Sequence, residues 1–139
     1  MSPELERRLV EKYPKLFGSY GAPPDESLLA FGFECGDGWF DLVDTLCTQL
    51  TKLKPADQDG EPLPLTALQV KEKYGTLRFY LGACSDEALA LVDFAEAMSA
   101  RVCEACGNKG RIRGTTWLKT LCDSCARGQG YADTERKAP

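Results

Sequence analysis

The sequence predicts an α+β fold: a small antiparallel sheet packed with two or three helices, followed by a C-terminal zinc ribbon. Three observations predict it. Two long segments carry apolar residues at helical spacing, three short segments alternate apolar with polar residues, and the last third contains two Cys-x-x-Cys pairs. A chain of 139 residues is long enough for one compact domain, but too short for two ordinary domains and a linker.

The first half of the chain predicts two helices and a strand. Residues 3–13 form a short helix, because Pro3 is tolerated in a first turn and apolar side chains then recur every four residues. Residues 29–35 alternate as a strand does. Residues 38–53 carry the longest amphipathic pattern, and Asp37 is placed to cap that helix.

The middle of the chain predicts a hairpin and a last long helix. Residues 54–64 are polar and broken by proline, which indicates a surface loop. The alternating runs around residues 68–71 and 77–81, separated by a turn at Gly75, predict two paired strands. Ser85 is a suitable N-cap for a helix whose buried stripe continues to Val102, immediately before the first cysteine pair. A helix running straight into that pair would couple the metal site rigidly to the core.

The cysteine pairs have the spacing of a four-cysteine zinc site, with ligands Cys103, Cys106, Cys122 and Cys125. We expect one structural Zn²⁺. Two disulfides or a redox pair are the alternative, which the lack of a secretory segment disfavours. A catalytic zinc needs an open position for water, whereas four thiolates close the coordination sphere.

The segment between the pairs explains why a metal is needed. It has only four large apolar side chains and three glycines, too little to fold alone. Zinc binding to such peptides contributes on the order of 10–16 kcal/mol, which suffices to order it. We therefore expect a core domain over residues 1–100, a zinc ribbon sharing that core over residues 101–127, and a flexible tail over residues 128–139.

Composition and charge restrict the class of protein. Hydrophobic content of 43% and charged content of 27% are typical of globular proteins. There is no apolar run of about 20 residues and no signal-peptide pattern, so we expect a cytoplasmic location and no membrane partner. Residues 1–100 have nine basic and seventeen acidic residues, a balance of −8, whereas residues 101–139 have eight and four, a balance of +4. The chain as a whole lacks a strongly basic nucleic-acid footprint.

The sequence gives little support for an enzyme. The chain has no histidine, which excludes a Cys-His mechanism. Cys35, Cys47 and Cys84 lie on apolar stripes or at element ends and are interpreted as small buried side chains. A hydrolase would need two carboxylates converging in a pocket, and no motif demands one.

Two groups of charged residues are candidates for partner contact. Glu34 and the predicted partner-binding residues Asp37, Asp41 and Asp44 surround the start of the second long helix, either as a solvated face or as a patch that docks on a basic partner. Basic side chains with a tryptophan beside them follow in the ribbon hairpin, where phosphate contact is an alternative to protein contact. The ribbon residues concerned are Trp117 and the possible nucleic-acid-binding Lys109, Arg111, Arg113 and Lys119.

A second basic group lies on the predicted hairpin. It interleaves cations with stacking side chains on what would be one exposed sheet face, a combination that binds single-stranded nucleic acid, although half-buried hairpins often look like this. Its members are Lys71, Lys73, Tyr74, Arg78 and Tyr80.

Residues 38–47, residues 69–80 and the closing cysteine pairs together resemble a group of small uncharacterised proteins common in phage, prophage and plasmid sequences. The most specific part is the run Lys-Glu-Lys-Tyr-Gly-Thr-Leu-Arg-Phe over residues 71–79. The resemblance implies a context, not an activity: such proteins often bind and disable a host machine, as anti-CRISPR proteins do.

These observations lead to one hypothesis and one alternative. The chain is expected to be a non-enzymatic zinc-ribbon protein that acts by protein–protein binding, as a phage- or plasmid-borne inhibitor of a bacterial host defence complex. The alternative is a nucleic-acid-binding zinc-ribbon module.

Overall fold

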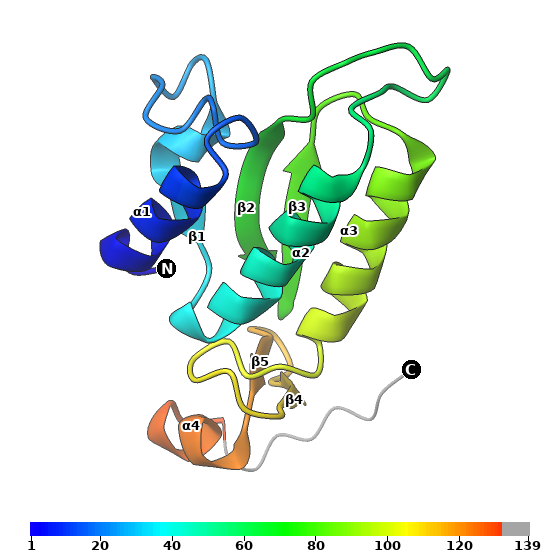
Figure 1. Cartoon of the computed structure of the whole chain (residues 1–139). Helices are drawn as coiled ribbons and strands as arrows, with labels where there is room; N and C mark the ends of the chain where they lie inside the picture. Colours follow the sequence, from blue (N-terminus) through cyan, green and yellow to red (C-terminus); the bar gives the residue numbers. More distant parts are fainter. Residues whose placement is uncertain (132–139) are drawn as a thin grey trace.

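The computed structural model describes residues 1–131 as a mixed α and β fold with four α-helices, a three-stranded sheet and a two-stranded sheet (Figure 1). The elements are α1 (Pro3–Lys12), the 3-10 turn η1 (Leu28–Phe31), β1 (Phe33–Glu34), the 3-10 turn η2 (Asp37–Trp39), α2 (Phe40–Lys52), β2 (Ala67–Lys73), β3 (Thr76–Leu81), α3 (Asp86–Ser99), β4 (Arg111–Arg113), β5 (Lys119–Leu121) and α4 (Asp123–Gly128). Most of the tail predicted over residues 128–139 lies outside the described residues.

The larger sheet has the order β1-β2-β3 and is mixed. β2 and β3 form the predicted antiparallel hairpin, with Val70 opposite Phe79. β1 runs parallel to β2, with Phe33 opposite Val70, so the prediction of a wholly antiparallel sheet is wrong at this strand. The reason is the connection: the chain passes through α2 before it returns as β2, and a crossover through a helix brings the next strand back in parallel.

Helices α2 and α3 cover one face of this sheet, and α1 lies beside β1 (Figure 1). The core fills the space between these layers. Its fully or nearly fully buried members include Leu9, Trp39, Val43, Leu50, Val70, Leu77, Phe79, Val92 and Ala95. Within residues 1–131, no helix is both long and apolar enough to cross a membrane.

The strand predicted over residues 29–35 is only two residues long. Ser27 accepts the N–H of Leu29 on its side chain and so starts the 3-10 turn η1 in place of extended backbone. Gly32 then takes a positive φ of 69°, which ends the turn and redirects the chain into β1. Alternation of apolar residues alone did not reveal this cap.

Both long helices start or stop differently from the prediction. α2 begins at Phe40, because the preceding residues form η2. α3 begins after Ser85, whose Oγ accepts the Ala88 N–H at 3.3 Å as predicted. It ends at Ser99, however, and residues 100–102 form a turn before Cys103, so the helix does not run straight into the metal site.

Both edges of the sheet are closed by polar groups from the flanking helices. On β3, the N–H groups of Leu77 and Phe79 donate to Ser99 Oγ at 2.8 Å and to Glu96 Oε1 at 3.0 Å. On β1, the Phe33 N–H donates to Glu6 Oε1 at 2.7 Å, and the Met1 ammonium donates to the carbonyl oxygens of Phe33 and Cys35. These contacts occupy edge groups with which another strand could otherwise pair.

Candidate metal centre

Four sulfurs form the predicted cluster. The Sγ atoms of Cys103, Cys106, Cys122 and Cys125 all lie within 4.8 Å of one another, and those of Cys106 and Cys122 are 3.7 Å apart. Sulfurs 2.3 Å from a tetrahedral metal would be separated by about 3.8 Å, whereas a disulfide would need about 2.05 Å. All seven cysteines are free thiols. This spacing fits a single metal ion bound by four sulfurs.

Two short turns aim these sulfurs at one point. The first turn closes where the Gly107 N–H donates to the Cys103 carbonyl oxygen at 2.9 Å, with Gly107 at a φ of +82°. The second is the start of α4, where the Cys125 N–H points at Cys122 Sγ at 3.4 Å. The hairpin of β4 and β5 joins the two turns. Each turn supplies two ligands, as the Cys-x-x-Cys spacing predicts.

The thiols differ in acidity. The pKa of Cys122 is lowered to about 7, first because the Cys125 N–H donates to its sulfur and then because neighbouring thiols do. The pKa of Cys125 is raised to about 12 by its hydrogen bonds with Cys122 and Cys106. Only the thiolate is a good metal ligand, so metal binding must release protons from this cluster.

The start of α2 is the first connection between cluster and core. The Gly38 N–H donates to the Glu104 carbonyl oxygen at 2.7 Å, and the buried indole of Trp39 donates through Nε1 to the Val102 carbonyl oxygen at 2.8 Å. A Cβ on Gly38 would lie 2.2 Å from the Cys103 carbonyl oxygen, so only glycine fits there. Sequence reasoning missed these contacts, although two glycines one residue apart before a helix are a signal of close backbone approach.

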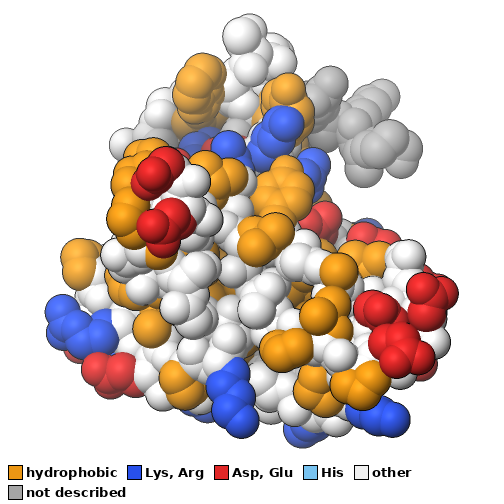
Figure 2. All heavy atoms as spheres, turned by 90° about the horizontal axis from the view of Figure 1, so that it is seen from above, with side chains coloured by type: hydrophobic (Ala, Val, Ile, Leu, Met, Phe, Trp, Pro, Cys, Tyr) orange, Lys and Arg blue, Asp and Glu red, His pale blue; other side chains and the backbone are white. Residues whose placement is uncertain are grey.

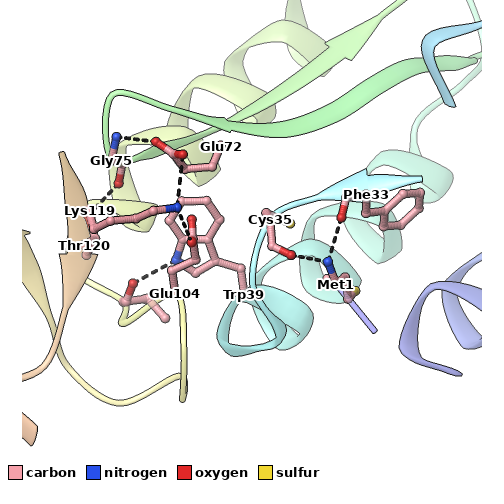
Figure 3. Close-up of polar contacts among 10 residues, drawn as sticks. Met1, Phe33, Cys35, Trp39, Glu72, Gly75, Glu104, Lys119 and Thr120 are labelled. Carbon is pink, nitrogen blue, oxygen red and sulfur yellow. Dashed lines mark hydrogen bonds and ion pairs between the residues drawn. The ribbon is translucent and has the colours of Figure 1, made fainter. Parts of the chain in front are cut away.

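The hairpin turn between β2 and β3 is the second connection (Figure 3). Thr120 Oγ1 donates to the Gly75 carbonyl oxygen at 2.6 Å. Lys119 Nζ lies between Glu72 Oε2, at 3.2 Å, and Glu104 Oε1, at 2.9 Å. These contacts join β5 to the end of the sheet directly above it in Figure 1. Hydrogen bonds and ion pairs therefore connect the metal cluster to the main core without an unbroken helix, although Cys103, Leu121 and Ala126 form a small apolar cluster of their own.

Burial affects both ends of the Lys119 contact. Burial raises the pKa of Glu104, and the Lys119 hydrogen bond offsets this only in part. Burial alone would lower the pKa of Lys119, but Glu104 and Glu72 outweigh it and the pKa is raised. Glu104 Oε2 is buried with no hydrogen-bond partner in residues 1–131.

Three of the four basic residues predicted for nucleic-acid contact have internal partners. The Arg113 side chain is only 2% exposed, donates to the Leu121 carbonyl oxygen and pairs with Asp123. Arg111 also pairs with Asp123, at 3.5 Å. Lys119 is held as described above. Lys109 is exposed, and its ammonium has no ion-pair or hydrogen-bond partner within residues 1–131.

Of the four acidic residues around the start of α2, two have partners within the protein and two are exposed. Asp37 accepts the Ser2 N–H at 2.7 Å at the start of α1. Asp44 accepts the Tyr13 hydroxyl at 2.6 Å and pairs with Lys12 at 2.9 Å. Asp41 and Glu34 are exposed. The structure does not bring these carboxylates together in a shared pocket among the cavities found.

Two aromatic side chains stand out on the surface beside the metal module. Trp117 is 74% exposed and Tyr74 is 68% exposed. They belong to adjoining segments, because a Cβ on Gly75 would lie 3.5 Å from the Leu118 backbone. Tyr74 also has a φ of +55°, which is rare for a bulky side chain. Trp117 was a predicted partner-binding residue, and Tyr74 was predicted as a stacking side chain in the basic group on the hairpin.

The remaining cysteines are buried, as predicted. Cys35, Cys47 and Cys84 contribute to the core. Burial raises the pKa of Cys35 to about 12 and also raises the pKa values of Cys47 and Cys84. Thiols in this state are poor nucleophiles.

The comparisons with known proteins found no matching family model, no matching curated protein and no matching solved structure.

Proposed function

We propose that this chain is a non-enzymatic protein that binds one structural zinc ion and acts by contact with a protein partner. The observation that carries the proposal is the position of two exposed aromatic residues at the junction of the metal module and the β2–β3 turn. The metal would fix the module, and the module presents Trp117 beside the turn that presents Tyr74.

Zinc is supported by the donor set. Four thiolates within tetrahedral reach and without an oxygen or nitrogen donor are typical of structural zinc, with iron the other common occupant of such sites. The closed set leaves no position for substrate. Elemental analysis and the colour of the purified protein distinguish the two metals, since a zinc–thiolate site is colourless.

Recognition of a protein is supported by the kind of surface exposed. Tryptophan and tyrosine are enriched among the residues that dominate binding energy at protein interfaces. A bulky residue held at positive φ costs free energy, of order 1–3 kcal/mol, and such strain clusters at functional sites. Lys73 lies over the Tyr74 ring at 5.4 Å, which adds positive charge to this surface.

The absence of catalysis is proposed on the state of the reactive groups. The three cysteines outside the cluster have raised pKa values. Asp37 and Asp44 serve backbone and side-chain contacts within the protein. The resemblance to phage and plasmid proteins supports a bacterial host defence complex as the partner and inhibition as the outcome. No contact in the described structure bears on this part of the proposal.

The test is affinity capture from bacterial lysate with matched variants. Proteins recovered with the wild type should be lost with W117A and with Y74A, but retained with F31A, which removes another exposed aromatic, 58% exposed, from η1. Equal recovery by the W117A/Y74A double variant and the wild type would contradict this site.

A nucleic-acid function is the second candidate, and the open sheet face supports it. Lys71 lies directly opposite Arg78 on the face that Val70 and Phe79 do not occupy, and Tyr80 beside them is 40% exposed. Like charges in this position repel each other unless an anion lies between them. Titration with single-stranded DNA and RNA at several salt concentrations tests it, because phosphate-driven binding weakens steeply as salt rises. No binding at low salt would remove this candidate.

A further inference from the structure

An apolar cavity of about 940 Å³ opens at the end of the molecule opposite the metal module. It lies between the C-terminal end of α2, the start of α3 and the loop over residues 53–65, whereas the metal module contacts the other ends of both helices. This size is within the range of small-molecule sites, about 300–1,000 Å³. The two ends of the protein therefore offer independent surfaces.

The lining is apolar with a cationic component. Leucine, proline and alanine side chains form most of the wall, joined by the hydroxyls of Thr51 and Ser85. Lys15 and Lys54 also line it, both are exposed, and neither has an ion-pair or hydrogen-bond partner on its ammonium in residues 1–131. No carboxylate lines the cavity.

Two acidic residues near the cavity, Asp57 and Asp86, accept hydrogen bonds from within the protein. Asp57 accepts the N–H groups of Asp59 and Glu61 and so shapes the loop tip. Asp86 lies within 3.4 Å of the Gln58 amide. Figure 2 looks onto this end of the molecule, and shows hydrophobic side chains gathered between acidic groups at the right edge and basic groups below.

We propose that this cavity binds an amphipathic anion: a linear apolar chain that ends in a carboxylate, such as a medium-chain fatty acid. The chain lies against the leucines and prolines, and the carboxylate reaches the ammonium groups of Lys15 and Lys54. An uncharged chain would leave both cations without a partner, and a chain with a cationic end would be repelled. The proposal is independent of the metal site and of the aromatic surface.

The test is calorimetric titration of the full chain with dodecanoate below its micelle concentration. Chain length gives the first readout: shortening the ligand from twelve to eight carbons should weaken binding by about threefold to fourfold per methylene, because each buried methylene contributes about 0.8 kcal/mol. Methyl signals of Leu50, Leu63 and Ala88 should shift on binding, since all three residues line the cavity.

Charge gives the second readout. K15E and K54E should each weaken dodecanoate binding by about fivefold, a factor typical of a partly exposed ion pair reversed in sign. K52E is the matched control, because Lys52 is exposed, carries the same charge change two residues away and does not line the cavity. Dodecanol should bind more weakly than dodecanoate to the wild type. The affinity for dodecanol should be the same in K54E and K52E.

Three results would overturn the proposal: no dodecanoate binding, equal binding of dodecanol and dodecanoate to the wild type, or an equal loss in K52E and K54E. Equal binding of dodecanol and dodecanoate would show that the cavity binds apolar chains without recognising the carboxylate. An equal loss in K52E and K54E would show that only the net charge of the protein attracts the anion.

Discussion

The indole Nε1 of Trp39 donates a hydrogen bond to the carbonyl oxygen of Val102 across 63 residues of chain, at 2.8 Å. Val102 directly precedes the first metal ligand, and Trp39 is fully buried in the core at the start of α2. This contact, together with the backbone bond from Gly38 to Glu104, connects the metal module to the start of α2.

Replacing Trp39 by phenylalanine should weaken this connection while keeping most of the buried ring. The Val102 carbonyl oxygen would lose its donor, and the smaller ring would leave a cavity, so we expect W39F to lower the free energy of unfolding by about 2 kcal/mol. Urea unfolding of the metal-loaded protein measures it. A change in stability below about 0.5 kcal/mol would show that the indole contact does not hold the module.

Adding one methyl group at Gly38 should disturb the metal site, although Gly38 is far from the four clustered cysteines in the sequence. The new Cβ would overlap the carbonyl oxygens of Cys103 and Glu104, at 2.2 and 2.6 Å, and the two segments would have to separate. We expect G38A to lower stability by about 2–3 kcal/mol and to weaken metal affinity. The matched control is G128A, because a Cβ on Gly128 meets nothing within 4 Å and should leave affinity unchanged.

Lys119 should be needed for the stability of the fold, because its ammonium lies between two carboxylates. K119M would leave Glu72 and the buried Glu104 facing each other without a cation, and breaking a buried pair from one side costs about 3 kcal/mol. Thermal unfolding of K119M, E104Q and the double variant K119M/E104Q measures the coupling. The double variant should regain part of the loss, and additive losses would indicate that the contact contributes little.

The Asp44 contact should make stability depend on acid. Partial burial would raise the pKa of Asp44, but hydrogen bonds from Tyr13 and Lys12 outweigh it and hold the pKa below its usual value. The folded protein therefore binds this proton more weakly than the unfolded chain, so the stabilisation is complete above the unfolded pKa and is lost as the pH falls through the folded pKa.

The comparison that isolates this effect is urea unfolding of wild type and D44N between about pH 6 and pH 2.5. D44N should be less stable at pH 6, by about 1 kcal/mol, and the difference should disappear at the acid end. D41N is the control, because Asp41 makes no hydrogen bond or ion pair in the described chain, and it should follow the wild type. A difference between wild type and D44N that stays constant with pH would contradict the assignment.

Much of this architecture could be predicted from local patterns. The Ser85 cap, the turn at Gly75 and the cysteine spacing each depend on chemistry within a few residues, and each is present in the structure. The 3-10 turn at η1 and the parallel direction of β1 could not be predicted, because they depend on a Ser27 hydrogen bond and on where the chain returns after α2.

The functional surface was harder to predict for the same reason. Spacing in the sequence grouped Arg113 and Lys119 with Lys109 as cations, but burial and long-range partners give the first two an internal role. Nothing near Glu104 in the sequence announces that it pairs with Lys119, fifteen residues away, or that Lys119 also pairs with Glu72 on β2. Only the folded arrangement separates cations that hold the structure from those that face solvent.

X-ray absorption at the zinc edge on freshly purified protein, combined with the metal content per chain, tests the four-sulfur zinc site directly. We expect one zinc per chain surrounded by four sulfurs at about 2.3 Å. A protein without bound metal, with nitrogen or oxygen among the ligands, or with these cysteines joined as disulfides would contradict it.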